Sequence, residues 1–229
     1  MKRHSLSFGE NAAMSNFYKV MYAIFVVPVR LFFCIRVVNK EKIPKEGGCI
    51  VCANHTSMLD VLILSAALGR QIRYMGKKEL FKIPLLRGFL TLLGAYPVDR
   101  GGADVGSIKK TISLLEDGEM IGIFPQGTRH AGVNPAETPV KHSVGMIAYH
   151  AKATVVPTYI RTRGNRVRFF RKTELVVGDP IPYESFGFES GGRNEYKTAT
   201  EKIFSDICAL GGYTRTLPPA DETKPEVQK

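Results

Sequence analysis

The sequence predicts an α/β domain, built as a layered, partly parallel mixed sheet flanked by helices, with an apolar helical segment ahead of it. Short apolar runs at Cys49–Ala53, Ile72–Gly76 and Met120–Phe124 are typical of buried strands, and stretches with apolar residues at helical spacing alternate with them. Such alternation favours a layered fold with parallel strand pairs. The length of 229 residues fits one domain with a substantial core.

The chain divides into four parts by composition. These are a polar leader (1–16), an apolar helical segment (17–38), the α/β domain (39–213) and a Pro- and charge-rich tail (214–229) expected to be disordered. Helices are expected at 58–68 with Ser57 as N-cap, at 79–93 with a break at Pro84, and at 105–116, 140–151 and 194–210. Further strands are expected at 155–160 and, as an antiparallel pair, at 167–170 and 174–177, while 94–100 is expected to be a loop or short strand.

The segment Val20–Val38 is apolar apart from Arg30 and Arg36. An arginine near mid-span costs about 2.5–3.5 kcal/mol on insertion, whereas each large aliphatic residue returns only about 0.3–0.6 kcal/mol, so the balance for spanning a membrane is close. Pro28 also interrupts helix regularity. We therefore expect a helix or helical hairpin that docks in the membrane interface on the cytoplasmic face, its arginines directed at lipid phosphates. A first core helix and a single span are the alternatives.

The net charge of +11 indicates a polyanionic partner: nucleic acid, an anionic membrane surface or phosphorylated substrates. We find no recognisable zinc finger, aromatic RNA-binding motif or recognition helix, so no nucleic-acid partner is expected. In the segment Met75–Arg100, lysines and arginines are interleaved with leucines and phenylalanines. That mixture suits a membrane surface or an amphipathic lipid ligand, and the alternative is an amphipathic core helix with solvated lysines.

Four cysteines occur, at positions 34, 49, 52 and 208. The C-x-x-C spacing of Cys49 and Cys52 is compatible with a metal or redox pair, but both lie in an apolar strand and no second pair completes a metal set. We interpret them as core cysteines of a protein from a reducing compartment.

The first candidate site is Asn54-His55-Thr56-Ser57-Met58-Leu59-Asp60, directly after an expected strand. Asp60, in the first turn of the following helix, is close enough in sequence to bond one ring nitrogen of His55 and leave the other free to accept a proton. The alternative is a loop histidine beside a solvated carboxylate.

The second candidate site is Phe124-Pro125-Gln126-Gly127-Thr128-Arg129, after another expected strand. Gly127 permits a tight turn, and Arg129 offers a planar fork that suits a phosphate monoester. The alternative is a turn with an exposed arginine. Both motifs stand at strand carboxyl ends, where such sheets place their chemistry.

The chain resembles the glycerophosphate and lysophosphatidate acyltransferase family over four blocks in family order, from about Gly47 to Ile160. The first block, N-H-x4-D, stands here as Asn54, His55 and Asp60. The second block corresponds to Lys77, Glu79–Phe81, Ile83-Pro84 and Gly94–Arg100. The third block corresponds to Phe124–Arg129, and the fourth, an apolar V-P strand, to Val156-Pro157. In the third block Gln126 replaces the usual glutamate and His130 follows the arginine where serine is common. A neutral glutamine cannot act as a base, which leaves the choice of acceptor open.

The resemblance implies transfer of a fatty acyl group from acyl-CoA or acyl carrier protein to the sn-2 hydroxyl of 1-acyl-glycerol-3-phosphate, in phospholipid biosynthesis. His55 is then the general base and Asp60 its orienting partner, with no acyl-enzyme, metal or other cofactor. The acceptor phosphate is assigned to Lys77, Arg100 and Arg129, and substrate positioning to Asn54, Gln126, Gly127 and Thr128. Implied partners are an anionic membrane surface and a lysophospholipid. Two alternatives are a relative that acts on glycerol-3-phosphate or another lyso-lipid, and an inert lipid-binding protein of this fold.

Overall fold

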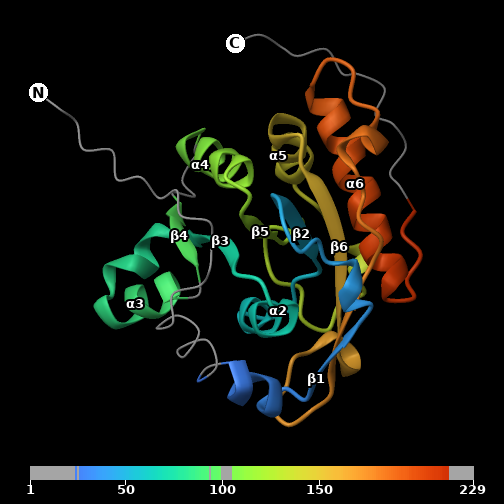
Figure 1. The fold of residues 1–229 in the computed structure, drawn as a ribbon. Coiled ribbons are helices and arrows are strands. Elements are labelled where there is room, and N and C mark those ends of the chain that lie inside the picture. Colours follow the sequence, from blue (N-terminus) through green and yellow to red (C-terminus); the bar gives the residue numbers. More distant parts are fainter. Residues whose placement is uncertain (1–23, 25, 93, 99–104, 217–229) are drawn as a thin grey trace, which may run out of the picture.

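The computed structural model describes residues 24, 26–92, 94–98 and 105–216, and its core is one seven-stranded mixed sheet in the order β1-β7-β6-β2-β5-β3-β4 (Figure 1). The strands are β1 (Ile35–Val38), β2 (Cys49–Ala53), β3 (Ile72–Lys77), β4 (Ala95–Val98), β5 (Met120–Ile123), β6 (Thr154–Arg161) and β7 (Thr173–Val177). Strands β6, β2, β5, β3 and β4 pair in parallel; β7 is antiparallel to β6 and parallel to β1. The predicted layered, partly parallel mixed sheet is confirmed.

Helices cover both faces of this sheet (Figure 1). They are α2 (Asp60–Leu68), α3 (Pro84–Leu92), α4 (Val105–Glu116), α5 (Ser143–Ala151) and α6 (Arg193–Leu210), with a short 3-10 helix η2 (Lys78–Lys82) before α3. Strand β2 shows why both faces need cover, because all five of its residues are buried. Ile50 and Cys52 pack in the cluster with α5 and α6, whereas Cys49, Val51 and Ala53 pack in the cluster with α2.

The segment before the sheet is only partly the helix that its composition predicts. Residues 24 and 26–32 are helical, but Ile35–Val38 forms the edge strand β1, paired with β7. A short apolar run fits a strand as well as a helix, and here a distant partner strand decides. Residues 1–23, which include the predicted leader, lie outside the described residues. Within the described residues, no helix combines the length and apolar character that crossing a membrane requires.

Three other local predictions are wrong. Residues 167–170 form no strand, and β7 pairs instead with β6 and β1. Ser57 does not cap α2: the N-cap residue is Leu59, and the Ser57 hydroxyl accepts a hydrogen bond from the Leu59 N–H. The predicted tail is ordered at its start, where Arg215 forms a buried 2.8 Å ion pair with Glu201 and donates to the Ala136 and Thr138 carbonyls. Residues 217–229 lie outside the described residues.

Candidate active site

The candidate residues come from loops that follow parallel strands. The His55 loop follows β2, the Gln126 loop follows β5, and Lys77 ends β3. Because β2, β5, β3 and β6 all run in parallel, their carboxyl ends meet at one edge of the sheet. The topology therefore brings these three features to the same edge, as the sequence predicts for its two motifs.

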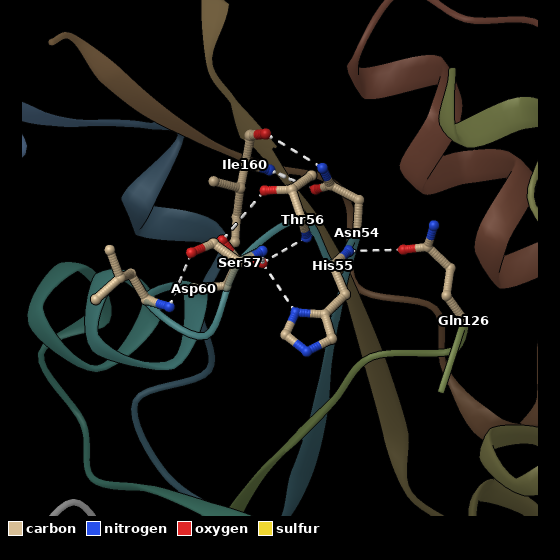
Figure 2. Close-up of polar contacts among 8 residues, drawn as sticks. Asn54, His55, Thr56, Ser57, Asp60, Gln126 and Ile160 are labelled. Carbon is tan, nitrogen blue, oxygen red and sulfur yellow. Dashed lines mark hydrogen bonds and ion pairs between the residues drawn. The ribbon is translucent and has the colours of Figure 1, made fainter. Parts of the chain in front are cut away.

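His55 and Asp60 form the predicted pair (Figure 2). The His55 Nδ1 atom lies 2.8 Å from Asp60 Oδ2, and the histidine side chain is 16% exposed while that of Asp60 is fully buried. With Asp60 as the acceptor, the proton of the neutral ring resides on Nδ1 and the lone pair is on Nε2. The Nε2 edge of the ring points away from Asp60 and is available to an incoming hydroxyl group (Figure 2).

The Asp60 carboxylate is held by backbone donors as well as by the histidine. Its Oδ2 atom accepts hydrogen bonds from the Thr56 N–H at 2.6 Å and the Ser57 N–H at 2.8 Å. These bonds supply the polar partners that a carboxylate buried in a protein needs. They also fix the carboxylate against the loop that carries His55, so the orientation of the imidazole is determined before any substrate binds.

Asn54, predicted to help position the substrate, bonds within the protein. Its side chain is buried and makes two hydrogen bonds with the backbone of Ile160 on β6: Nδ2 donates to the carbonyl at 3.2 Å, and Oδ1 accepts from the N–H at 2.7 Å (Figure 2). Asn54 therefore extends the β2–β6 pairing by one residue and fixes the start of the His55 loop.

Gln126 also bonds within the protein. Its Oε1 atom accepts a hydrogen bond from the His55 backbone N–H at 2.6 Å, and its Nε2 donates to the Thr138 hydroxyl at 2.7 Å. That hydroxyl in turn donates to the Pro135 carbonyl. Gln126 is 3% exposed, so both halves of the amide are satisfied in a buried position. Its side chain therefore positions His55 through the backbone.

The turn after Gln126 is exposed and basic. Gly127 has φ +67°, which favours glycine, and a Cβ atom added there would lie 2.7 Å from Cδ of Lys141. The side chain of Lys141 therefore lies over the turn, and its backbone N–H donates to the Pro125 carbonyl. Thr128, Arg129 and Lys141 are all exposed, and neither cation forms an ion pair within the residues that the structure describes. Both are available to an anion at this edge.

The remaining predicted phosphate ligands are placed only in part. Lys77 is exposed at the carboxyl end of β3 and has a 3.8 Å contact with Glu79, a weak surface pair. Arg100 lies outside the described residues. The structure thus brings Lys77 and Arg129 to the same edge as His55.

Three further residues shape the site although the motifs did not single out their roles. The Phe124 ring stacks on the His55 ring, with centroids 4.0 Å apart and an interplanar angle of 14°. Thr138 completes the bonding of Gln126, and Lys141 lies over Gly127. Phe124 is recognisable in sequence as the last apolar residue before the turn. Thr138 and Lys141 have no such signal, because their roles depend on how the loop folds back.

The C-x-x-C cysteines belong to the core. Cys49 and Cys52 are buried on opposite faces of β2, and burial raises the pKa of both thiols. In the described part of the chain, no group of three or more His, Cys, Asp and Glu side chains is arranged to hold a metal ion.

Comparison with known proteins agrees with this geometry. A family profile described as "Acyltransferase" matches residues 34–161. The 1-acyl-sn-glycerol-3-phosphate acyltransferase of Bacillus subtilis is 36% identical over 155 residues, covering 66% of this chain and 76% of that protein. The protein of the same name from Streptococcus pneumoniae is 30% identical over 148 residues, covering 62% and 54%.

A solved structure supports the fold. The crystal structure of the 1-acyl-sn-glycerophosphate (LPA) acyltransferase PlsC from Thermotoga maritima superposes with a TM-score of 0.63 at 24% identity, covering 84% of this chain and 80% of that one. The profile spans more than half of the sequence, including the His55 loop, the Gln126 loop and β6. The resemblance carried by the four sequence blocks is thereby confirmed, and this chain belongs to the acyltransferase family.

Proposed function

We propose that the protein transfers a fatty acyl group from a thioester to the free sn-2 hydroxyl of 1-acyl-glycerol-3-phosphate and so makes phosphatidate for phospholipid synthesis. The observation that carries this proposal is the His55–Asp60 pair, which lies at the sheet edge that also bears Lys77 and Arg129. The names of the Bacillus and Streptococcus relatives support the choice of acceptor.

The chemical step needs one base and no covalent intermediate on the protein. His55 Nε2 accepts the proton of the acceptor hydroxyl while its oxygen attacks the thioester carbonyl. The tetrahedral oxyanion then collapses, the carbon–sulfur bond breaks, and the imidazolium returns its proton to the departing thiolate. Asp60 stabilises the imidazolium between these steps, because its buried carboxylate lies 2.8 Å from Nδ1.

The oxyanion requires hydrogen-bond donors that the fold has not already used. The Thr56 and Ser57 N–H groups bond to Asp60, and the Gly127 N–H bonds to the Phe124 carbonyl. In the described residues the N–H groups of Thr128 and Arg129 make no hydrogen bond, so we assign oxyanion stabilisation to this part of the turn.

The acceptor phosphate is assigned to the exposed cations of this edge. Arg129 suits a phosphate because its guanidinium offers two parallel N–H donors, and Lys77 adds a second positive charge. Lys141, which lies over the same turn, is a third candidate. Arg100, from the same sequence block as Lys77, completes the assignment made from the family resemblance.

The replacement of glutamate by Gln126 had left glycerol-3-phosphate and other lyso-lipids open as acceptors. Both halves of the Gln126 amide are bonded inside the protein, so this position offers no contact by which it would select a different acceptor. The same intact hydrogen bonds around His55 and Asp60 favour an active enzyme over an inert lipid-binding protein.

The donor is proposed to be acyl-CoA or an acyl carrier protein, and the enzyme is proposed to work at the cytoplasmic face of an anionic membrane. The exposed apolar residues Ile24, Val27 and Leu31, which precede β1, support the association with a membrane.

The proposal is tested by presenting the purified protein, in vesicles, with both donors and three acceptors. These are 1-acyl-glycerol-3-phosphate, glycerol-3-phosphate and 1-acyl-glycerol, which lacks the phosphate. We expect phosphatidate as the main product and a value of kcat/KM for 1-acyl-glycerol about 10- to 100-fold lower, because the charge-assisted bonds to phosphate are lost. Faster acylation of glycerol-3-phosphate than of 1-acyl-glycerol-3-phosphate would contradict the acceptor assignment.

A further inference from the structure

The connection between β6 and β7 has an unusual composition. Five of the eleven residues from 162 to 172 are Arg or Lys, none is Asp or Glu, and two adjacent phenylalanines, Phe169 and Phe170, stand among them. Neither the catalytic pair nor the assigned phosphate ligands use this segment. Its chemistry therefore needs an explanation of its own.

The two phenylalanines lie on the surface. Phe169 is 59% exposed and Phe170 is 71% exposed. Phe170 also has φ +55°, a left-handed conformation that is rare for a bulky residue. Two phenylalanines that remain mostly in water, one of them in a disfavoured backbone conformation, indicate a surface whose role goes beyond folding.

The phenylalanines continue into the helix that precedes β1. The Phe170 ring meets the Phe32 ring edge-on at 5.4 Å, and the Phe170 N–H donates to the Phe32 carbonyl at 2.6 Å. Phe169 stacks on the buried Phe33 at 5.0 Å. Figure 1 shows this helix, in blue, beside the orange connection at the lower end of the view. Two segments more than a hundred residues apart in sequence thus form one surface.

The helix adds an aliphatic stripe to this surface. Ile24, Val27 and Leu31, at helical positions i, i+3 and i+7, are exposed, whereas Val29 and Phe33 face the core on the other side. A helix that is apolar on both its core face and its solvent face is expected only where a second apolar phase covers it. We call the helical residues 24 and 26–32, together with Phe169 and Phe170, the docking face.

The two segments that form the docking face also carry exposed cations. Arg30, Arg163, Arg166, Arg168 and Arg171 are exposed, and none forms an ion pair among the residues that the structure describes. Lys172 lies 3.6 Å from Glu174, which also pairs with Arg161 at the end of β6. Exposed apolar side chains bordered by unpaired cations complement a bilayer with anionic head groups. Nucleic acid would satisfy the cations but not the aliphatic stripe.

The docking face is connected to the catalytic edge. The β6–β7 connection begins at the carboxyl end of β6, the same sheet edge as the His55 loop. The Asn165 carbonyl accepts from the Gly132 N–H at 2.8 Å, and the Asn165 side chain donates to the Val133 carbonyl at 3.0 Å. The same loop donates from the His130 N–H to the His55 carbonyl. Docking would therefore set the height of His55 relative to the lipid surface.

We propose that the β6–β7 connection is a second membrane-binding element: Phe170, with Phe169, inserts into an anionic bilayer beside the N-terminal helix while the surrounding arginines bind lipid phosphates. This extends the membrane association proposed above, but it concerns binding and does not depend on which acceptor is acylated.

The test is sedimentation of the full chain with vesicles of phosphatidylcholine alone and with about one third phosphatidylglycerol. Phe170→Asn removes the ring and suits a positive φ, so the fold is retained. We expect this variant to lose roughly tenfold in the partition coefficient for anionic vesicles, the order expected for withdrawing one phenylalanine from an apolar phase. The matched control is Val105→Asn, which removes a similarly exposed apolar side chain from α4.

A second variant keeps the test independent of Phe170. Arg168→Gln with Arg171→Gln should lower binding to anionic vesicles by about fivefold per arginine and leave binding to neutral vesicles unchanged. Lys109→Gln with Lys110→Gln, which removes the same charge from α4, should have a smaller effect. His55→Ala should bind vesicles like the wild type, which separates docking from catalysis. Unchanged binding by Phe170→Asn or by the arginine variant, or no binding of the wild type to anionic vesicles, would overturn the proposal.

Discussion

The backbone N–H of His55 donates a 2.6 Å hydrogen bond to Oε1 of Gln126. On the other side of the same residue, the His55 carbonyl accepts from the His130 N–H at 2.9 Å. The proposed base is therefore held at both of its peptide groups by the loop that follows β5. Holding the His55 N–H requires only a side-chain oxygen at position 126 that accepts a hydrogen bond. A neutral glutamine can therefore replace the glutamate that is usual in the family.

Gln126 is predicted to act through His55 and not through the acceptor. Gln126→Ala removes both of its hydrogen bonds and leaves a largely buried N–H without a partner, which should lower the free energy of unfolding by about 1–3 kcal/mol. The looser His55 should lower kcat, with KM for the acceptor unchanged. Denaturant unfolding and steady-state kinetics measure the two effects. Gln71→Ala, at the amino end of β3 and therefore at the opposite edge of the sheet, is the control.

Gln126→Glu provides a sharper test of the same position. The carboxylate can still accept from the His55 N–H, and the Thr138 hydroxyl can turn to donate to it. We expect kcat within about tenfold of the wild type and the same order of preference among acceptors. A change of preferred acceptor would show that this side chain contacts the substrate directly.

Asp60 is predicted to determine which ring nitrogen of His55 carries the proton. In Asp60→Asn the amide can present its N–H group to Nδ1, which places the proton on Nε2, where the lone pair is needed. We expect kcat to fall on the order of 10²- to 10⁴-fold, with a smaller effect on KM. The control is Asp179→Asn, because Asp179 is 86% exposed and its partner in the described part of the chain is Lys42. Equal activity in Asp60→Asn would exclude an orienting role for this carboxylate.

Arg129 is predicted to bind the acceptor phosphate. Arg129→Ala should raise KM for 1-acyl-glycerol-3-phosphate by about 10- to 100-fold, the loss expected for a charge-assisted hydrogen bond, and should leave the rate with 1-acyl-glycerol almost unchanged. The comparison of the two acceptors separates phosphate binding from a general disturbance of the site. Arg193→Ala, at the start of α6, removes an exposed arginine from another element. An equal loss with both acceptors would contradict the assignment.

The cysteines provide a test of the core. Cys34 is exposed, whereas burial raises the pKa of Cys49 despite the nearby Arg70 and raises the pKa of Cys208 to about 11. A buried thiol with a raised pKa is both inaccessible and protonated. An aromatic disulfide reagent should therefore modify Cys34 quickly in the native protein and all four cysteines after denaturation. Cys34→Ser should remove the fast phase, and fast modification of Cys49 or Cys52 would place β2 outside the core.

The sequence predicted those elements whose patterns are local. The helix at 105–116, the strand at 49–53 and the final helix agree with the structure to within one residue. Ile35–Val38 was predicted to be helical because an apolar run has no period that separates the two states, and its partner strand β7 comes more than a hundred residues later. Residues 167–170 have strand-like side chains, but the contacts of Phe169 and Phe170 with the N-terminal helix determine their conformation.

The candidate site was predictable to a similar degree. The contact between His55 and Asp60 follows from five residues of spacing and a helix start, and the structure shows it. The role of Gln126 depends on the Thr138 hydroxyl and on a backbone group of another loop, neither of which a linear motif records. For the same reason, the motif does not indicate that the Asn54 side chain bonds to the backbone of Ile160.

The most direct test of the central claim is the rate of acyl transfer to 1-acyl-glycerol-3-phosphate by wild type and His55→Ala, measured in anionic vesicles with equal amounts of bound protein. We expect the wild type to form phosphatidate and the variant to lose at least about 100-fold in kcat, because it lacks the base that accepts the hydroxyl proton. A His55→Ala protein as active as the wild type would contradict the account of this site.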